Sequence, residues 1–208
     1  LTIISDTEKI IRKSNPDFDI EKVPLDDKKT YKFISSGRTD GVFQLESAGM
    51  KQVLTKLQPE SIEGIIATIA LYRPGPMDSI PTFIANKLDP RKIRYKTPLL
   101  EPILKVTYGC IVYQEQVQSA ARILAGYSLG KADVLRRAMG KKKPEVLARE
   151  QIPFFAGMKE HGYSEEAAQA VWDILVPFSG YAFNKAHSAA YGLISYWTAY
   201  LKAHYPVE

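Results

Sequence analysis

Residues 184–203 read NKAHSAAYGLISYWTAYLKA, and this stretch decides the fold class. Its apolar side chains recur every three or four positions, which is the spacing of an amphipathic helix; they are Ala186, Ala190, Leu193, Ile194, Trp197 and Leu201. Asn184 stands where an N-cap belongs, because its side chain can accept a bond from the first free backbone N–H groups. A long helix over 184–203 is therefore predicted.

The same helical spacing runs through most of the chain. Met50, Val53, Leu54 and Leu57 follow it and predict a helix over 46–57. Other helices are predicted over 3–11, 62–70, 129–139 and 144–161 and after a Ser164 cap. Short apolar runs at 42–45 and 110–113 are interpreted as strands. The predicted fold is mainly α, a multi-helix domain with about ten helices and a few short β-strands.

The composition is that of a folded chain. With 45% hydrophobic and 25% charged residues, the 208 residues can build one sizeable core or two small ones, which excludes wholesale disorder. Apolar runs are too short and too often interrupted for a membrane span. Cys110 is the only cysteine, so no internal disulfide can form and a reducing, cytoplasmic compartment is expected. The chain begins with Leu1 and stops soon after its last helix, which predicts a segment cut from a longer protein.

Positive charge is concentrated in one stretch. The whole chain carries a net charge of +5, which permits a polyanionic partner without requiring one. Residues 128–143 alone account for this excess, because one acid, Asp133, stands among six cations: Lys131, Arg136, Arg137, Lys141, Lys142 and Lys143. Cations at a helix C-terminus can simply complement the helix dipole. The density of the cluster instead favours a site for several phosphates, bound by the donor forks of arginine and the point charges of lysine.

The start of the last predicted helix is a second candidate anion site. Lys185, His187 and Ser188 fall in its first turn, where free backbone N–H groups point outward. A lysine there opposes the helix dipole unless an anion is shared, and that conflict favours a functional role. The alternative is that Lys185 is a plain surface residue and His187 packs against Tyr191, four positions later.

Two further segments carry weaker signals. The corner Arg73-Pro74-Gly75-Pro76 is stiff, but it can be a plain helix terminator. Around Gln114, at the start of a predicted helix, the side-chain amides of 113–116 either bind polar groups or cap the helix. The stretch 126–132 looks like a phosphate loop, but it is one residue too short and lacks the Ser or Thr that holds a metal. The sequence contains neither a zinc cluster nor a convincing metal-binding carboxylate pair, so no metal site is predicted.

Five motifs in this order resemble one family closely, the bacterial replicative DNA polymerase III alpha subunit of the DnaE type. Each motif is weak alone, but five in register over about 150 residues are highly specific. The motifs are Thr39–Ser47 (TDGVFQLES), Ala70–Met77 (ALYRPGPM), Thr107-Tyr108-Gly109 with Val112–Val117 (VYQEQV), Ala132–Lys142 (ADVLRRAMGKK), and Phe183-Asn184-Lys185 with His187. The family often has serine where this chain has Ala186, so Ala186 is given no role.

The resemblance implies a polymerase built from palm, thumb and fingers, in which the fingers cover the incoming deoxynucleoside triphosphate. Residues 1–22 would be the connecting helix from the palm, and 23–208 the fingers. The three catalytic aspartates and their Mg²⁺ ions would lie in the palm, before residue 1, so no catalytic or metal-binding residue is assigned here. By the same resemblance, template-primer DNA is a partner, and the full-length protein would also bind the sliding clamp, the clamp loader and a proofreading exonuclease.

Site residues follow from the cation pattern and the resemblance together. The expected nucleotide-binding residues are Arg136, Arg137, Lys141, Lys185 and His187. The expected DNA-binding residues are Lys142, Lys143, Arg73 and Gln114. The fragment alone is expected to be inactive. The alternative is a non-catalytic helical module that holds nucleic-acid backbone through residues 128–143, with no nucleotide chemistry.

Overall fold

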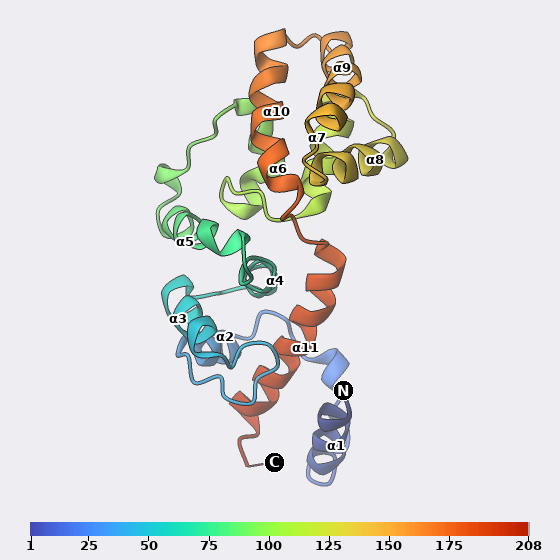
Figure 1. Cartoon of the computed structure of the whole chain (residues 1–208). Coiled ribbons are helices and arrows are strands. Elements are labelled where there is room, and N and C mark those ends of the chain that lie inside the picture. The colour runs from blue at the N-terminus through green and yellow to red at the C-terminus, as the bar shows by residue number, and fades with distance from the viewer. Residues whose placement is uncertain (208) are drawn as a thin grey trace. The chain divides into compact units, whose positions relative to one another are not determined.

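The computed structural model describes residues 1–207, which form two compact units. The end unit joins residues 1–72 to the chain from residue 186 onwards, and the central unit consists of residues 73–185. Helices and loops make up both units, as Figure 1 shows. Among the described residues, no helix is both long and apolar enough to cross a membrane.

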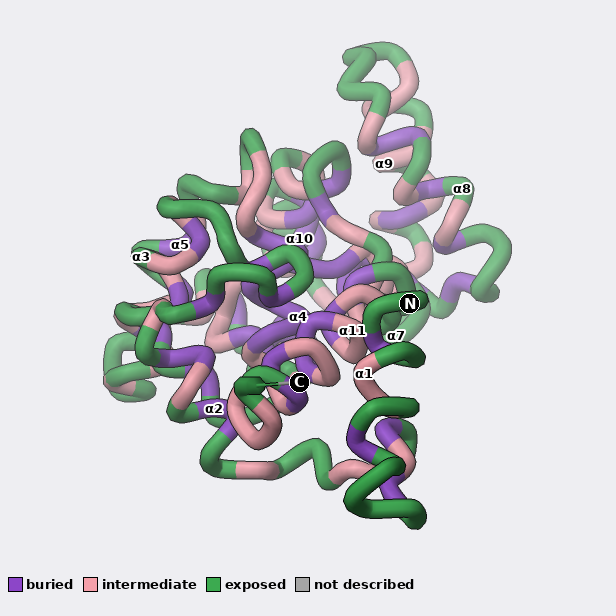
Figure 2. The backbone as a smooth tube through the Cα atoms, turned by 90° about the horizontal axis from the view of Figure 1, so that it is seen from below, coloured by how far each residue is buried: buried purple, intermediate pink, exposed green. Residues whose placement is uncertain are grey.

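The end unit is built from helices at both ends of the chain. They are α1 (Thr2–Ile11), α2 (Lys28–Ser35), α3 (Ala48–Leu57), α4 (Ile62–Leu71) and α11 (Lys185–His204). The side chains of Asp27, Ser47 and Ser61 cap α2, α3 and α4 by accepting backbone N–H bonds. Figure 2 shows α4 buried along most of its length, because its apolar residues point in every direction.

α11 supplies apolar residues to both cores of the end unit. In the larger core, Tyr196 and Ala199 are fully buried against residues of the N-terminal segment such as Ile34, Leu54 and Ile65. In the smaller core, Leu201 packs with residues of α1 and the loop that follows it, namely Ile4, Ile11, Phe18 and Ile20. Burial of these side chains from α11 against residues far away in sequence is the main force that holds the end unit together.

The central unit is a bundle of helices that follow one another in sequence. It contains α5 (Ile80–Leu88), α6 (Glu101–Leu104), α7 (Gln114–Ala125), α8 (Leu129–Gly140), α9 (Pro144–Glu160) and α10 (Glu165–Ser179). One core runs through α6 to α10 and includes Val117, Leu135 and Phe154, none of them exposed. α9 approaches α7 so closely that a Cβ on Gly157 would lie 2.3 Å from the carbonyl oxygen of Ala125.

The two predicted strands are wrong. Residues 42–45 form a tight turn in which Val42 and Leu45, three positions apart, are both buried, while the hydroxyl of Thr39 donates to the carbonyl of Leu45 at 2.5 Å. Three-residue spacing of buried side chains fits a turn and not the alternation of a strand. In 110–113 only Tyr113 pairs, in a single parallel bridge with Phe183. Among residues 1–207 this bridge is all the sheet-like pairing present.

The mainly helical prediction is confirmed, with small differences at helix ends and with one helix, α5, that the sequence did not predict. The last helix starts at Lys185, one residue later than predicted. Gly140 lies inside α8, and the left-handed turn residue after this helix is Lys142, with φ 52°. The division of the chain between residues 22 and 23 stays a prediction.

Candidate functional site

The segment between α10 and α11 is the centre of the candidate site. Gly180–Lys185, here called the linker segment, passes beside the start of α7 within the central unit. The N–H of Gln114 donates to the carbonyl of Phe183 at 2.8 Å, and the N–H of Phe183 donates to the carbonyl of Val112 at 2.9 Å. These paired bonds hold the linker segment against α7 at the point where both lead into a helix.

Arg73 reaches the linker segment from the other end of the central unit. Its guanidinium donates to the carbonyl of Tyr181 and lies over the ring of Phe183, 4.6 Å from the centroid. Burial lowers the pKa of Arg73 from its usual value. Gly75 follows with φ +97°, and a Cβ there would come within 2.7 Å of the Tyr181 ring, so the corner at 73–76 fits closely against this tyrosine. The corner is therefore more than a helix terminator.

Lys142 approaches Tyr181 as well. Its ammonium lies 4.1 Å from the centroid of the ring, a cation–π contact between the turn after α8 and the linker segment. Tyr181 remains 45% exposed, so this pair lies at the surface. Lys141 and Lys143 flank Lys142 on the same exposed turn.

The first turn of α11 faces a carboxylate of the protein itself. The N–H of Lys185 donates to both carboxylate oxygens of Glu115, at 3.1 and 3.0 Å. The ammonium of Lys185 lies 5.3 Å from the ring centroid of Tyr113. The sequence argument required a shared anion to reconcile this lysine with the helix dipole, and Glu115 supplies negative charge at that position.

Arg136 and Arg137 share the single acid of the cationic stretch. Asp133 accepts from the Nε of Arg137 at 2.8 Å and from Arg136 at 2.9 Å, and these bonds lower the pKa of the carboxyl group. Gln118 of α7 donates to the same carboxylate at 3.0 Å. The Arg136 side chain is only 17% exposed whereas that of Arg137 is 68% exposed. Asp133 thus orients both guanidinium groups, of which that of Arg136 is largely buried and that of Arg137 is exposed.

α7 connects the two groups of contacts. Glu115, which meets Lys185, and Gln118, which meets Asp133, are three residues apart and lie on one side of this helix. The central unit therefore brings together five of the predicted residues along the first turns of α7 and the linker segment: Arg73, Gln114, Lys142, Lys185 and, through Asp133, Arg136. Their roles in binding stay predictions.

His187 lies in the end unit. Its ring is 4.5 Å from that of Tyr191, which is the packing alternative raised by the sequence. The sequence left open whether the side-chain amides of 113–116 bind polar groups or cap the helix. For Gln116 capping is correct, because its buried side-chain carbonyl accepts the N–H groups of Val112 and Tyr113 at 2.8 and 2.9 Å. Gln116 caps the helix.

Sequence reasoning missed the acidic and aromatic partners in this region. Glu115 stands beside Gln114 in the motif but received no role, and Asp133 was counted only as a charge. Tyr113 and Tyr181 carry lysines on their rings. The sequence signal that could have indicated the aromatic partners was the presence of tyrosines beside the motifs. Within residues 1–207, no group of three His, Cys, Asp or Glu side chains is arranged to hold a metal ion.

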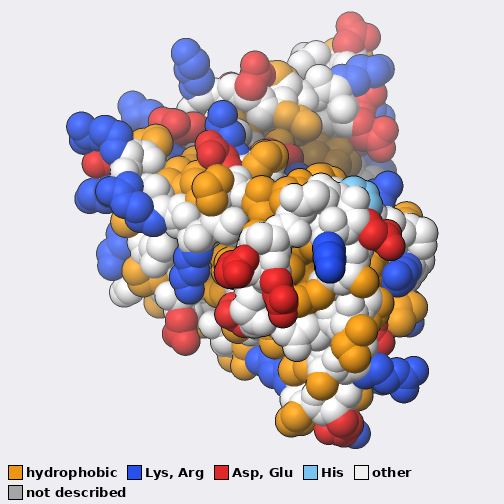
Figure 3. Space-filling model, turned by 90° about the horizontal axis from the view of Figure 1, so that it is seen from above, with side chains coloured by type: hydrophobic (Ala, Val, Ile, Leu, Met, Phe, Trp, Pro, Cys, Tyr) orange, Lys and Arg blue, Asp and Glu red, His pale blue; other side chains and the backbone are white. Residues whose placement is uncertain are grey.

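On the face that Figure 3 shows, basic side chains do not form one continuous patch. Seen from above, lysines and arginines project from several separate places, with acidic groups between them (Figure 3).

The helical fold, with residues of four of the five motifs meeting around the linker segment, agrees with the class that the sequence resembles, a polymerase fingers domain. Residues 1–162 match the family model of the bacterial DNA polymerase III alpha subunit finger domain, and the chain belongs to this family. It is 53% identical over 206 residues to DNA polymerase III subunit alpha of Borreliella burgdorferi, covering 99% of this chain and 18% of that protein.

Two other relatives agree. DNA polymerase III subunit alpha of Aquifex aeolicus is 50% identical over 203 residues, which cover 97% of this chain and 18% of the relative. The subunit of Caulobacter vibrioides is 52% identical over 208 residues, which cover 100% of this chain and 18% of the relative. The chain thus spans about a fifth of the length of these relatives, which agrees with the expectation of a segment of a longer protein.

Proposed function

We propose that this chain is the fingers region of a DNA-directed DNA polymerase and binds the incoming deoxynucleoside triphosphate and the nascent template-primer. Catalytic aspartates and Mg²⁺ would be supplied by another part of the full-length subunit, working in the cytoplasm. Clamp, clamp loader and proofreading exonuclease would contact that longer protein. Family membership supports the general activity, and the contacts of the central unit support the binding roles.

The observation that carries the proposal is the convergence of cations on the linker segment. Arg73 and Lys142 reach it from two separate parts of the central unit and contact the rings of Phe183 and Tyr181. Lys185, the last residue of the linker segment, lies over the ring of Tyr113 at the start of α7. Cations held on ring faces keep their positive charge available to an anion. We assign Lys185, Arg136, Arg137, Lys141 and His187 to the triphosphate, and Arg73, Gln114, Lys142 and Lys143 to DNA.

Arg136 is the residue best suited to orient a phosphate. Its guanidinium is mostly buried and held by Asp133, so little side-chain entropy is lost when a ligand binds. Each charge-assisted bond to a phosphate contributes about 1.5–3 kcal/mol. Because negative charge develops on the pyrophosphate leaving group during the reaction, such a bond would also stabilise the transition state.

The test uses a chimaera in which this chain replaces the aligned segment of the Aquifex aeolicus subunit. Arg136→Ala should lower kcat/KM for nucleotide incorporation by tenfold or more, because about 1.5 kcal/mol of binding is lost. The Kd for template-primer should change little. Arg149→Ala, at an exposed position of α9, is the matched control. Unchanged incorporation by the Arg136→Ala chimaera would remove this arginine from the site.

A non-catalytic nucleic-acid module remains the second candidate, on the basis of the exposed turn at Lys141–Lys143. That function predicts DNA binding whose Kd rises steeply with salt concentration and is indifferent to added nucleoside triphosphate. Competition by triphosphate at constant ionic strength therefore separates the two candidates.

A further inference from the structure

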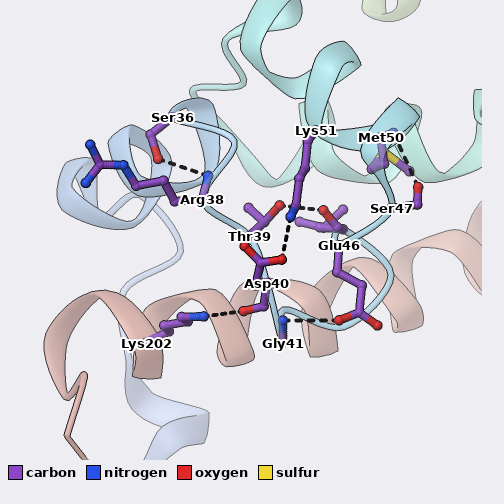
Figure 4. Close-up of polar contacts among 11 residues, drawn as sticks. Ser36, Arg38, Thr39, Asp40, Gly41, Glu46, Ser47, Met50, Lys51 and Lys202 are labelled. Atoms are coloured by element: carbon purple, nitrogen blue, oxygen red, sulfur yellow. Dashed lines mark hydrogen bonds and ion pairs between the residues drawn. The ribbon is translucent and has the colours of Figure 1, made fainter.

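The motif at residues 39–47 lies outside the site described above, and its polar groups are used by the loop that it forms in the end unit. Lys51 meets the Asp40 carboxylate at 2.5 Å, and Glu46 accepts a backbone N–H of the loop at 3.1 Å (Figure 4). Lys202 of α11 donates to the carbonyl of Asp40. These contacts hold the loop against α11 and account for the motif as part of the fold of the end unit.

A cavity of about 620 Å³ lies within the central unit, and none of its lining residues belongs to the linker segment. Its floor is apolar and belongs to the core, because Leu100, Leu104 and Ile111 are buried. Close-packed protein interiors leave few voids larger than a water molecule, and cavities of about 300–1,000 Å³ are the size that binds small molecules. The cavity is therefore larger than a packing defect and large enough for a ligand.

Four separate segments of the central unit line this cavity. They are residues 78–86 on η2 (Pro76–Ser79) and α5, residues 92–97, residues 100–111, and residues 173–178 of α10. An extended peptide needs an open groove or a sheet edge, whereas walls on several sides suit a compact molecule. The walls on η2 and α10 adjoin the corner at 73–76 and the linker segment, so a bound molecule would touch both elements that position the candidate site.

The wall formed by residues 92–97 is fixed by contacts with the protein behind it. The buried side-chain amide of Asn86 donates to the carbonyl of Tyr108 at 2.8 Å, which joins α5 to the turn at Gly109. Gly109 has φ +83°, and a Cβ on it would lie 2.9 Å from the side chain of Ile93, so Ile93 packs directly over this glycine. The wall thus has a defined shape before any ligand binds.

Three cations project from this wall. Lys92, Arg94 and Lys96 line the cavity and are exposed, whereas the intervening Ile93 and Tyr95 are partly buried. Alternate residues of an extended segment share a side, so the three positive groups gather at one edge of the cavity.

The nearby acids leave this edge positive. Asp89, just before the wall, pairs with Arg91 at 2.8 Å. Of the two carboxylates that line the cavity, Asp173 lies on α10 and accepts from Gln169 at 2.7 Å, and Asp78 lies on η2. Three cations on one wall and two carboxylates on the others make the lining polar at its edge and positive on one side.

We propose that this cavity binds a small molecule that has an apolar body and one acidic group. The body would lie on the apolar floor, and the acidic group would meet the cations of residues 92–96. Charge-assisted hydrogen bonds from lysine and arginine to a carboxylate or phosphate are the strong class of such contacts. No residue assigned to DNA or to the triphosphate lines the cavity, so binding here does not depend on the proposed function.

The experiment compares two fluorescent probes that share one aromatic body. One is 8-anilinonaphthalene-1-sulfonate, which carries an acidic group, and the other is N-phenyl-1-naphthylamine, which carries none. Each is titrated into the Aquifex aeolicus chimaera, and its rise in emission gives a Kd. The double variant Lys92→Gln/Lys96→Gln removes two cations of the wall. The matched control is Lys105→Gln/Lys159→Gln, which removes two exposed lysines of the central unit that do not line the cavity.

Cys110 reports whether a probe occupies the cavity, because this partly buried residue is one of those that line it. Burial raises the pKa of the thiol to about 11, so it reacts slowly and protection is measured as a change in rate. The chimaera is treated with N-ethylmaleimide with and without the sulfonate probe, and peptide mass spectrometry follows the alkylation of Cys110.

We expect the sulfonate probe, at about ten times its Kd, to slow alkylation of Cys110 about tenfold. Lys92→Gln/Lys96→Gln should raise the Kd of the sulfonate probe about fivefold, as for two charges that stay in contact with water. The Kd of the neutral probe should not change, and Lys105→Gln/Lys159→Gln should change neither Kd.

Three outcomes would overturn the proposal. Alkylation of Cys110 at an unchanged rate would show that the probe binds elsewhere. An equal Kd of the sulfonate probe in the two double variants would remove the cations, and with them the acidic ligand. Binding of the probe with protection of Cys110 in the chain of 208 residues but not in the chimaera would show that another part of the subunit fills the cavity.

Primer extension by the chimaera is a separate measurement. Its absence would count against the proposed function, whereas the Kd values and the alkylation rate of Cys110 need no polymerisation and would still test the cavity.

Discussion

The central and end units reach stability by different routes. In the central unit, α7 to α10 are consecutive in sequence and share one core. In the end unit, α11 is joined to the first 72 residues by contacts between residues more than 150 positions apart, including Tyr196 with Pro24 and His204 with Asp27. Consecutive helices can find one another locally, whereas the end unit depends on one distant helix. We therefore expect the end unit to be the more sensitive to single changes in α11.

The largest expected effect is loss of the Tyr196 ring, which is fully buried in the end unit. Tyr196→Ala should lower the free energy of unfolding of the end unit by about 3–5 kcal/mol. The chain has two tryptophans, Trp197 in the end unit and Trp172 in the central unit. Single-tryptophan variants can therefore report urea unfolding of each unit by fluorescence.

The matched substitution is Phe154→Ala, which removes a buried ring of the central unit. It should shift the transition of Trp172 by a similar amount. If Tyr196→Ala moves the transitions of both tryptophans equally, the two units unfold as one and the comparison drawn here is broken.

A smaller effect is expected from the buried amide of Gln116 in the central unit. Gln116→Leu leaves the N–H groups of Val112 and Tyr113 and the hydroxyl of Thr107 without this partner. Buried groups that lose their hydrogen bonds cost about 1–3 kcal/mol each, so a loss of about 3 kcal/mol is expected in the Trp172 transition. Gln118→Leu, on the partly exposed side of α7, is the control and should cost less than about 1 kcal/mol. Equal costs would contradict the capping role of Gln116.

Two glycines sharpen the comparison further. A Cβ on Gly157 of the central unit meets the backbone oxygen of Ala125 at 2.3 Å, whereas a Cβ on Gly192 of the end unit meets the Ile66 side chain at 2.9 Å. The backbone contact at Gly157 is much shorter than the side-chain contact at Gly192, so Gly157→Ala should cost about 2–3 kcal/mol and Gly192→Ala about 1–2 kcal/mol. Thermal unfolding with both tryptophan reporters measures the two costs, and the reverse order would show that α9 and α7 separate easily.

The smallest effect is a pH dependence confined to the end unit. Burial disfavours the charged form of Asp27, but hydrogen bonds from His204 and Thr30 outweigh it and lower the pKa of this carboxyl to about 2. Because the pKa is lower in the folded chain, the stabilisation is complete above about pH 4 and is lost as pH falls from about 4 towards 2. About 1 kcal/mol is expected, since the pair remains partly in water.

Asp27→Asn is the control for this pH dependence. It should flatten the dependence of the Trp197 transition between about pH 4 and pH 2 and leave that of Trp172 unchanged. If the unfolding transition reported by Trp197 keeps its full pH dependence in the Asp27→Asn variant, the acid sensitivity comes from other carboxylates.

Sequence alone was sufficient for most of the helices because they carry their own signals, whereas α5 was not predicted. Ser164 was predicted as a cap, and its hydroxyl accepts the N–H of Ala167. The run at 42–45 was too short for periodicity to separate a strand from a turn. The turn is stabilised by Thr39, whose buried hydroxyl donates to the carbonyl of Leu45. In a strand that carbonyl would instead accept from a neighbouring strand.

The sequence predicted the cationic residues of the candidate site but not the residues that contact them. Arg136, Lys142 and Lys185 stand out by residue type and position. Glu115, which meets Lys185 from 70 residues away, becomes visible only when α7 and the linker segment lie together. The stacking of Phe43 on Tyr191 likewise follows from the placement of the loop against α11. Long-range pairs of this kind carry no spacing signal within a single sequence.

The discontinuity of the end unit bears on how the protein is made. A ribosome adding roughly 5–20 residues per second completes the first 72 residues on the order of 10 s before α11 emerges. During that interval the faces of α2, α3 and α4 that await Tyr196 and Ala199 stay uncovered, while the intervening helices can already assemble. Nascent chains stalled before α11 should therefore be held by chaperones at the N-terminal helices.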